Sequence, residues 1–106
     1  MSYEVKDNTE EVLSALERAK ERALEAIGIA AEGYAKEETP VDTGRLRNSI
    51  SHAVSDDAAY VGSNVEYAPF VELGGRHNKA HHMLQRAATE HREEYKRLLE
   101  ESMKNA

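Results

Sequence analysis

An apolar stripe with the period of an α-helix runs through the first third of the chain, and it constrains the fold more than any other feature. Its members recur every three or four residues, the spacing of one helix face: Val12, Leu16, Ala19, Ala23, Ile27, Ala30 and Tyr34. Asn8 and, three residues later, Glu11 match a capping-box pattern, and Pro40 disfavours helical geometry at Thr39. The pattern therefore predicts one long helix over residues 8–38.

Two environments fit this helix. An apolar stripe is typical of a helix that packs on the core of its own domain. Small residues between Gly28 and Gly33 also permit close approach to a neighbouring subunit. Aromatic residues are only 6% of the chain and charged residues 32%, which is thin material for a core built by one small chain. The composition thus favours apolar surface shared between subunits.

Residues 41–67 are predicted to form a turn followed by a small antiparallel sheet. Residues 41–48 fit a turn or a short helical segment. Strands are expected over about 49–55 and 59–63, because Ile50 and Val54 share one face and the pair Asp56-Asp57 is a turn signal. A third short extended piece includes Val65 and Tyr67.

The last third of the chain predicts two helices separated by a polar loop. Pro69 fits the first turn of a short helix over 69–73, and Gly74-Gly75 ends it. Residues 74–80 form the loop. A C-terminal helix over 82–103 carries one face made of Leu84, Ala88, His91, Tyr95 and Leu98. The whole predicts a single α+β domain over residues 1–106, with the C-terminal helix packed on the sheet.

The charge pattern disfavours tight binding to nucleic acid. The net charge is −6, and residues 1–40 hold ten acids against five bases. An acidic surface repels the phosphate backbone, although an acidic lumen lets a duplex pass without sticking. A rival nucleic-acid-binding module would have to use the one basic cluster, which is Arg45, Arg47, Arg76 and Lys79.

No pattern of catalytic, cofactor-binding or metal-binding residues is recognised. The chain has no cysteine, so thiolate chemistry and disulfides are excluded. The N-terminal residues lack the pattern of a signal peptide, and no apolar run reaches the length that crosses a bilayer. The group Asp42, Thr43, Arg45 and Ser49 lacks the order of a catalytic triad. Glu66 and Glu72 likewise lack any sign of an acid–base pair.

Four histidines raise the alternative of a small metal-dependent enzyme. They are His77, His81, His82 and His91. His77 and His81 are four residues apart and would share a face of a continuous helix, as metal ligands often do. Gly75 and Asn78 place His77 in a loop instead. We therefore expect solvated histidines and no metal site.

Two sequence blocks carry a family resemblance. The first is Pro40-Val41-Asp42-Thr43-Gly44-Arg45-Leu46-Arg47-Asn48-Ser49-Ile50, and the second runs from Val61-Gly62-Ser63 through Tyr67-Ala68-Pro69-Phe70-Val71-Glu72 to Gly74. In this order, and followed by a C-terminal helix, they resemble the tail-component family typified by gene product 10 of the Hong Kong 97 phage. One departure is the stretch Ala80–Ala87, where the family usually has a proline at the start of the last helix.

The resemblance implies a non-enzymatic structural protein of a phage or prophage, in the neck or tail-completion region. Its implied partners are copies of itself in a ring, a head-closure protein, and tail-tube or terminator proteins, with DNA only passing through a lumen. No cofactor and no membrane are implied. The implied location is the virion at the head–tail junction, after assembly in the host cytoplasm. The alternative is a cytoplasmic tail-assembly chaperone that the virion does not retain.

Two groups of residues are predicted to carry these contacts. Asp42, Thr43, Gly44, Arg45 and Leu46 are expected to form an architectural and contact loop. Tyr67, Phe70, Glu72 and Leu73 are expected to be core and interface residues, because aromatic side chains are enriched in both settings.

Overall fold

The long N-terminal helix is present as α1, Thr9–Glu38, in the computed structural model, which describes residues 2, 9–40, 44–76 and 79–105. Glu10 and Glu11 in its first turn complement the helix dipole. The hydroxyl of Thr39 donates a hydrogen bond to the Ala35 carbonyl at 2.7 Å, closing the last turn just before Pro40. The predicted cap Asn8 lies outside the described residues.

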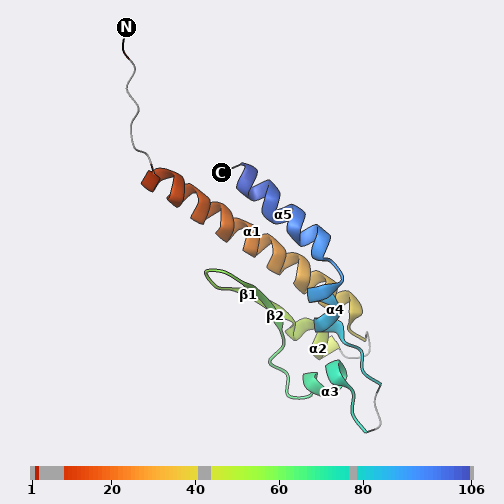
Figure 1. Ribbon diagram of the computed structural model, residues 1–106. Helices are drawn as coiled ribbons and strands as arrows, with labels where there is room; N and C mark the ends of the chain where they lie inside the picture. Colours follow the sequence, from red (N-terminus) through yellow and green to blue (C-terminus); the bar gives the residue numbers. More distant parts are fainter. Residues whose placement is uncertain (1, 3–8, 41–43, 77–78, 106) are drawn as a thin grey trace.

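The other elements gather around α1 (Figure 1). Helix α5, Arg92–Lys104, runs antiparallel along one flank of α1, and a hairpin of β1, Ser51–Val54, and β2, Ala59–Gly62, packs along another flank. Three short helices lie near the C-terminal end of α1: α2, Gly44–Ser49; α3, Ala68–Leu73; and α4, Met83–Thr89. The predicted α+β class is confirmed. None of the described helices is long and apolar enough to cross a membrane.

The hairpin is antiparallel, and its register pairs His52 with Val61 and Val54 with Ala59. Its first strand begins later than predicted, because Ser49 still belongs to α2, where its hydroxyl donates to the Leu46 carbonyl at 2.6 Å. The expected third extended piece is not a strand in the described chain. Instead the carbonyl of Val65 accepts the backbone N–H of Ala68 in a turn that leads into α3.

Small residues fill the buried positions of α1. Ala19, Ala23, Ala31 and Ala35 are buried, whereas Val12 at the start of the predicted stripe is exposed. The core consists of two clusters of buried residues, and Leu84 packs against both. One contains Leu46, Val65, Ala68 and Met83, and the other contains Ala35, Ile50 and Ala87. The predicted stripe is therefore right in the middle of α1 and wrong at its beginning, where no other element covers the helix.

The prediction of a single C-terminal helix over 82–103 is wrong, because the helix is interrupted between α4 and α5. Thr89 turns its hydroxyl back onto the Gln85 carbonyl at 2.8 Å, an arrangement that bends helices. The hydroxyl of Tyr95 donates to the Ala87 carbonyl, which in a continuous helix would accept the N–H of His91. The His91 ring stacks on Tyr34, with ring centroids 3.5 Å apart. The Tyr95 hydrogen bond holds α5 against α4, and the His91 stack holds the start of α5 against α1.

Candidate functional site

Some residues of the predicted contact loop make contacts within their own chain. Asp42 and Thr43 lie outside the described residues, and Gly44 begins α2. Leu46 is fully buried, so it is a core residue. The Arg45 guanidinium pairs with both carboxylate oxygens of Glu66 at 3.2 and 3.3 Å and lies over the Tyr67 ring.

The electrostatics of Glu66 agree with this pairing. Its own backbone N–H and then the Arg45 guanidinium lower the pKa of the Glu66 carboxyl below its ordinary value. Both partners of the pair are exposed, so it contributes little to stability. Its role is to fix α2 against the segment that precedes α3.

In the second predicted group, which is Tyr67, Phe70, Glu72 and Leu73, some side chains are partly buried and others are exposed. Tyr67 is half-buried against the first core cluster. Phe70 is 59% exposed and Leu73 is 69% exposed, so the expectation that they belong to the core is wrong for the isolated chain. The reason is that α3 has only six residues and uses Ala68 to reach the core. The expectation that Phe70 and Leu73 make contacts with another chain stays a prediction.

Glu72 has a structural task that the sequence did not reveal. Its carboxylate accepts the backbone N–H groups of Leu84 at 2.7 Å and Gln85 at 3.0 Å. Those N–H groups belong to the first turn of α4, which has no side-chain cap at His82. Two backbone bonds, from His81 to Val71 and from His82 to Glu72, hold the returning chain beside α3. Glu72 thus starts α4 where relatives are expected to use a proline.

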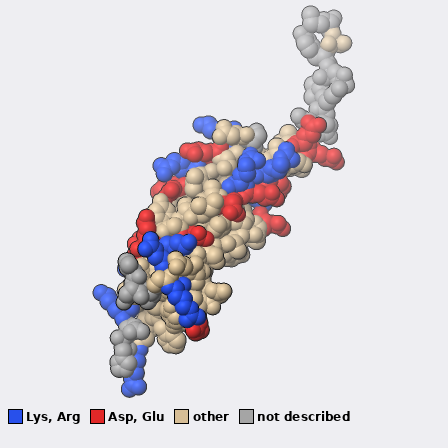
Figure 2. Space-filling model, turned by 180° about the vertical axis from the view of Figure 1, so that it is seen from behind, with Lys and Arg blue, Asp and Glu red and all other residues tan. Residues whose placement is uncertain are grey.

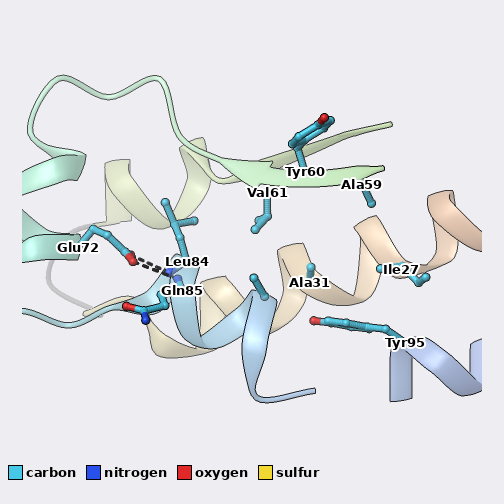
Figure 3. A pocket seen from close by; sticks show the side chains of 10 residues that line it. Ile27, Ala31, Ala59, Tyr60, Val61, Glu72, Leu84, Gln85 and Tyr95 are labelled. Atoms are coloured by element: carbon cyan, nitrogen blue, oxygen red, sulfur yellow. Dashed lines mark hydrogen bonds between the residues drawn. The ribbon is translucent and has the colours of Figure 1, made fainter. Parts of the chain in front are cut away.

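An apolar groove lies between β2, α1 and the α4–α5 segment (Figure 3). Its volume is about 410 Å³. Val61 and Ala59 point into it from β2 while Tyr60 points away, and Tyr95 closes the opposite side. The lining residues are Ile27, Ala31, Ala59, Tyr60, Val61, Glu72, Leu84, Gln85, Ala88 and Tyr95.

The hairpin has open edges in the described chain. The hydrogen bond from the Ser55 N–H to the Ala58 carbonyl makes that pair a hydrogen-bonded one. In an antiparallel ladder the bonded pairs alternate, so the backbone groups of Ala59 and Val61 face outward from β2. Unpaired strand edges are sites where another chain can add a strand. This open edge of β2 borders the apolar groove, because Ala59 and Val61 also line the groove.

The histidines do not form a metal site within the described part of the chain, where no cluster of three or more possible ligands occurs. His77 lies outside the described residues. His81 is exposed, whereas His82 takes a left-handed conformation at φ 51° and points its Nδ1 into the interior.

The histidine that sequence reasoning passed over is His52. It projects from β1 onto α1 between two carboxylates, with Nε2 2.6 Å from Glu25 and Nδ1 3.1 Å from Glu32. Hydrogen bonds to Glu25 and then Glu32 raise the pKa of His52 above its ordinary value. The available signal was the seven-residue spacing of Glu25 and Glu32, which places both on one helix face.

Residues 4–74 match the family described as Bacteriophage HK97-gp10, putative tail-component. The chain belongs to this tail-component family. The match covers both sequence blocks and runs from the N-terminal segment through α3. It ends before α4 and α5, so the Glu72 cap acts on a part of the chain that lies beyond the matched residues. No curated protein and no solved structure matches the chain. Membership in the tail-component family supports a structural role in a phage and association with the virion.

Proposed function

We propose that the protein is a neck or tail-completion component that acts in head–tail joining or tail assembly. It does so by associating with copies of itself and with other virion proteins, among them a head-closure protein and tail-tube or terminator proteins. In this proposal it is not an enzyme. The family membership supports the phage structural part, and the surface of the isolated chain supports the part about association.

The observation that carries the proposal is the exposed apolar surface of α3. A small domain with one phenylalanine leaves that phenylalanine and the neighbouring Leu73 in solvent. Aromatic and aliphatic side chains placed this way form the centre of many protein interfaces. The open edge of β2 beside the apolar groove offers a second surface of the same kind.

The test combines size-exclusion chromatography and light scattering with co-purification. The wild-type protein is measured at several concentrations and two salt levels, alone and with the head-closure and tail-tube proteins of the same phage. We expect a discrete oligomer or a stable complex, and we expect Phe70→Ser/Leu73→Ser to weaken it. Ile29→Ser/Leu99→Ser, which also removes two exposed apolar side chains and lies outside both α3 and the groove, is the control for α3. A wild-type chain that neither self-associates nor binds any of these partners would overturn the proposal.

Mass spectrometry of purified virions separates a resident component from the chaperone alternative. A virion component is found in mature particles at a fixed ratio to the tail proteins. A chaperone binds the same partners in the cell extract and is lost from the particles. Filter binding at low salt checks for nucleic-acid affinity, which we expect to be weak because the chain carries a net charge of −6.

A further inference from the structure

The start of α1 is an apolar surface bordered by negative charge. Val12 and Leu13 are 46% and 57% exposed, and no other element covers this part of the helix in Figure 1. From Thr9 to Arg18 the chain holds three acids and one base, Arg18, which lines a surface hollow together with Glu10 and Glu11, so the net charge here is negative. Glu10 and Glu11 form no ion pair with any described residue. Figure 2 shows red side chains at the very end of this helix, with blue side chains following along it.

The α3 end of the molecule carries positive charge that is unpaired among the described residues, the opposite of the start of α1. Phe70 and Leu73 are exposed there, and Arg76 and Lys79 follow along the chain. The acids nearby are already engaged, since Glu66 pairs with Arg45 and Glu72 caps α4. Neither Arg76 nor Lys79 has an ion-pair partner within the described chain, and blue side chains mark this end in Figure 2.

We propose that the start of α1 in one copy contacts the α3 end of the next copy. Each surface has two exposed apolar side chains at its centre, and the net charge at its border is negative at the start of α1 and positive at the α3 end. An apolar centre with a complementary charged border is the usual anatomy of a specific interface. The inference rests on the proposed function, because it names the surfaces through which the self-association occurs.

The partner that fits is a second copy of this chain in a head-to-tail arrangement. Within one chain the two surfaces are held apart by α1, a helix of 30 residues and hence about 45 Å long. A two-fold contact of either surface with itself would bring like charges together, which costs energy. A contact between two different surfaces is heterologous, so repeated copies close into a ring or extend as a chain.

A charge swap tests this contact. Variant one is Glu10→Lys/Glu11→Lys, which makes both ends positive, and variant two is Arg76→Glu/Lys79→Glu, which makes both ends negative. We expect each variant alone to self-associate about tenfold more weakly than the wild type, since two attractive pairs become repulsive. An equimolar mixture restores association, because the positive end of one variant then meets the negative end of the other.

Sedimentation velocity at low salt provides the readout, and circular dichroism checks that each variant is folded. Arg92→Glu/Lys96→Glu is the matched control for variant two. It makes the same change from positive to negative charge on exposed residues of α5 and should self-associate as the wild type does. Variants that associate as the wild type does, or a mixture that does not recover, would overturn this contact while leaving assembly through the groove intact. A wild-type chain that stays monomeric yet binds its virion partners would also overturn it, and would leave the proposed function standing.

Discussion

The imidazole ring of His52 lies directly on the backbone of Gly28. A Cβ atom built on Gly28 would be 2.6 Å from Cδ2 of His52 and 3.1 Å from its Cγ. The ring cannot turn aside freely, because its two nitrogens contact Glu25 and Glu32 on the same helix. One glycine in α1 therefore permits the close approach of β1 and fixes how the hairpin seats on the helix.

We predict that Gly28→Ala destabilises the protein although alanine is the better helix former. The helix propensity of alanine favours the variant by about 1 kcal/mol, but the displaced ring loses its carboxylate partners, and overpacking typically costs about 1–3 kcal/mol. Gly33→Ala is the matched control, since a Cβ there meets no atom within 4 Å, and it should stabilise by about 0.5–1 kcal/mol. Urea denaturation of both variants gives the comparison, and a stabilised Gly28→Ala would contradict the seating of His52.

The pH dependence of stability should reflect the same cluster. Hydrogen bonds to Glu25 and Glu32 raise the pKa of His52 above 6.5, so its contribution is complete below pH 6.5 and is lost as the pH rises through the raised value. The hydrogen bond from His52, and then Lys36, lowers the pKa of Glu32 below 4.5. The contribution of Glu32 is therefore present above pH 4.5 and is lost as the pH falls through the lowered value.

We expect this cluster to stabilise the fold most between about pH 4.5 and pH 6.5. The urea midpoint measured from pH 4 to pH 9 checks this, with His52→Gln as the reference, because glutamine keeps a donor and does not titrate. Above pH 6.5 the difference between wild type and His52→Gln should shrink. A difference that stays constant across that range would mean that His52 is not charged in the folded state.

Glu72→Ala should destabilise α4 and with it the core that Met83 anchors. Removing a carboxylate that accepts two first-turn N–H groups costs about 1–2 kcal/mol. Glu72→Gln keeps one acceptor oxygen and should lose less. Glu90→Ala is a suitable control, because Glu90 is exposed and has only a 3.8 Å pair with Arg86. Equal unfolding midpoints for Glu72→Ala and Glu90→Ala would show that the cap is dispensable.

Tyr95→Phe tests the contact that holds α5 where the C-terminal helix breaks. The variant leaves the Ala87 carbonyl without the donor that the tyrosine hydroxyl supplies, which costs about 1 kcal/mol. Tyr60→Phe is the matched control, since that side chain is exposed on the far face of β2. Thermal unfolding followed by circular dichroism distinguishes them, and a Tyr95→Phe midpoint no lower than that of Tyr60→Phe would count against the contact.

The elements that the sequence predicted well are those with strong local signals. The stripe around Ala19 and Ala23, followed by Pro40, predicted that the long helix ends at residue 38, and α1 ends at Glu38. Pro69 and Gly74 bounded α3, and Gly74 takes the positive φ of 81° that favours glycine at a helix end. These signals act between residues a few positions apart, so they operate whatever the rest of the chain does.

The candidate site was predictable only in part. The two sequence blocks pointed to the tail-component family, and residues 4–74 match it. The sequence did not reveal that Phe70 and Leu73 face solvent, because an apolar residue in a short helix is equally consistent with a core position and an interface position. Nor did it reveal the groove, whose walls come from α1, β2, α4 and α5.

The sequence by itself determined the long helix, the hairpin, the short helix and the family, because helix periodicity, turn residues and motifs are encoded over short distances along the chain. Only the tertiary structure decided that the C-terminal helix breaks at Glu90–His91, that Glu72 caps α4, and that His52 sits on Gly28 between two carboxylates. Each of these depends on a contact between residues at least eight positions apart. The order of residues over a short stretch does not indicate which distant donor, acceptor or small residue the folded backbone brings into contact with that stretch.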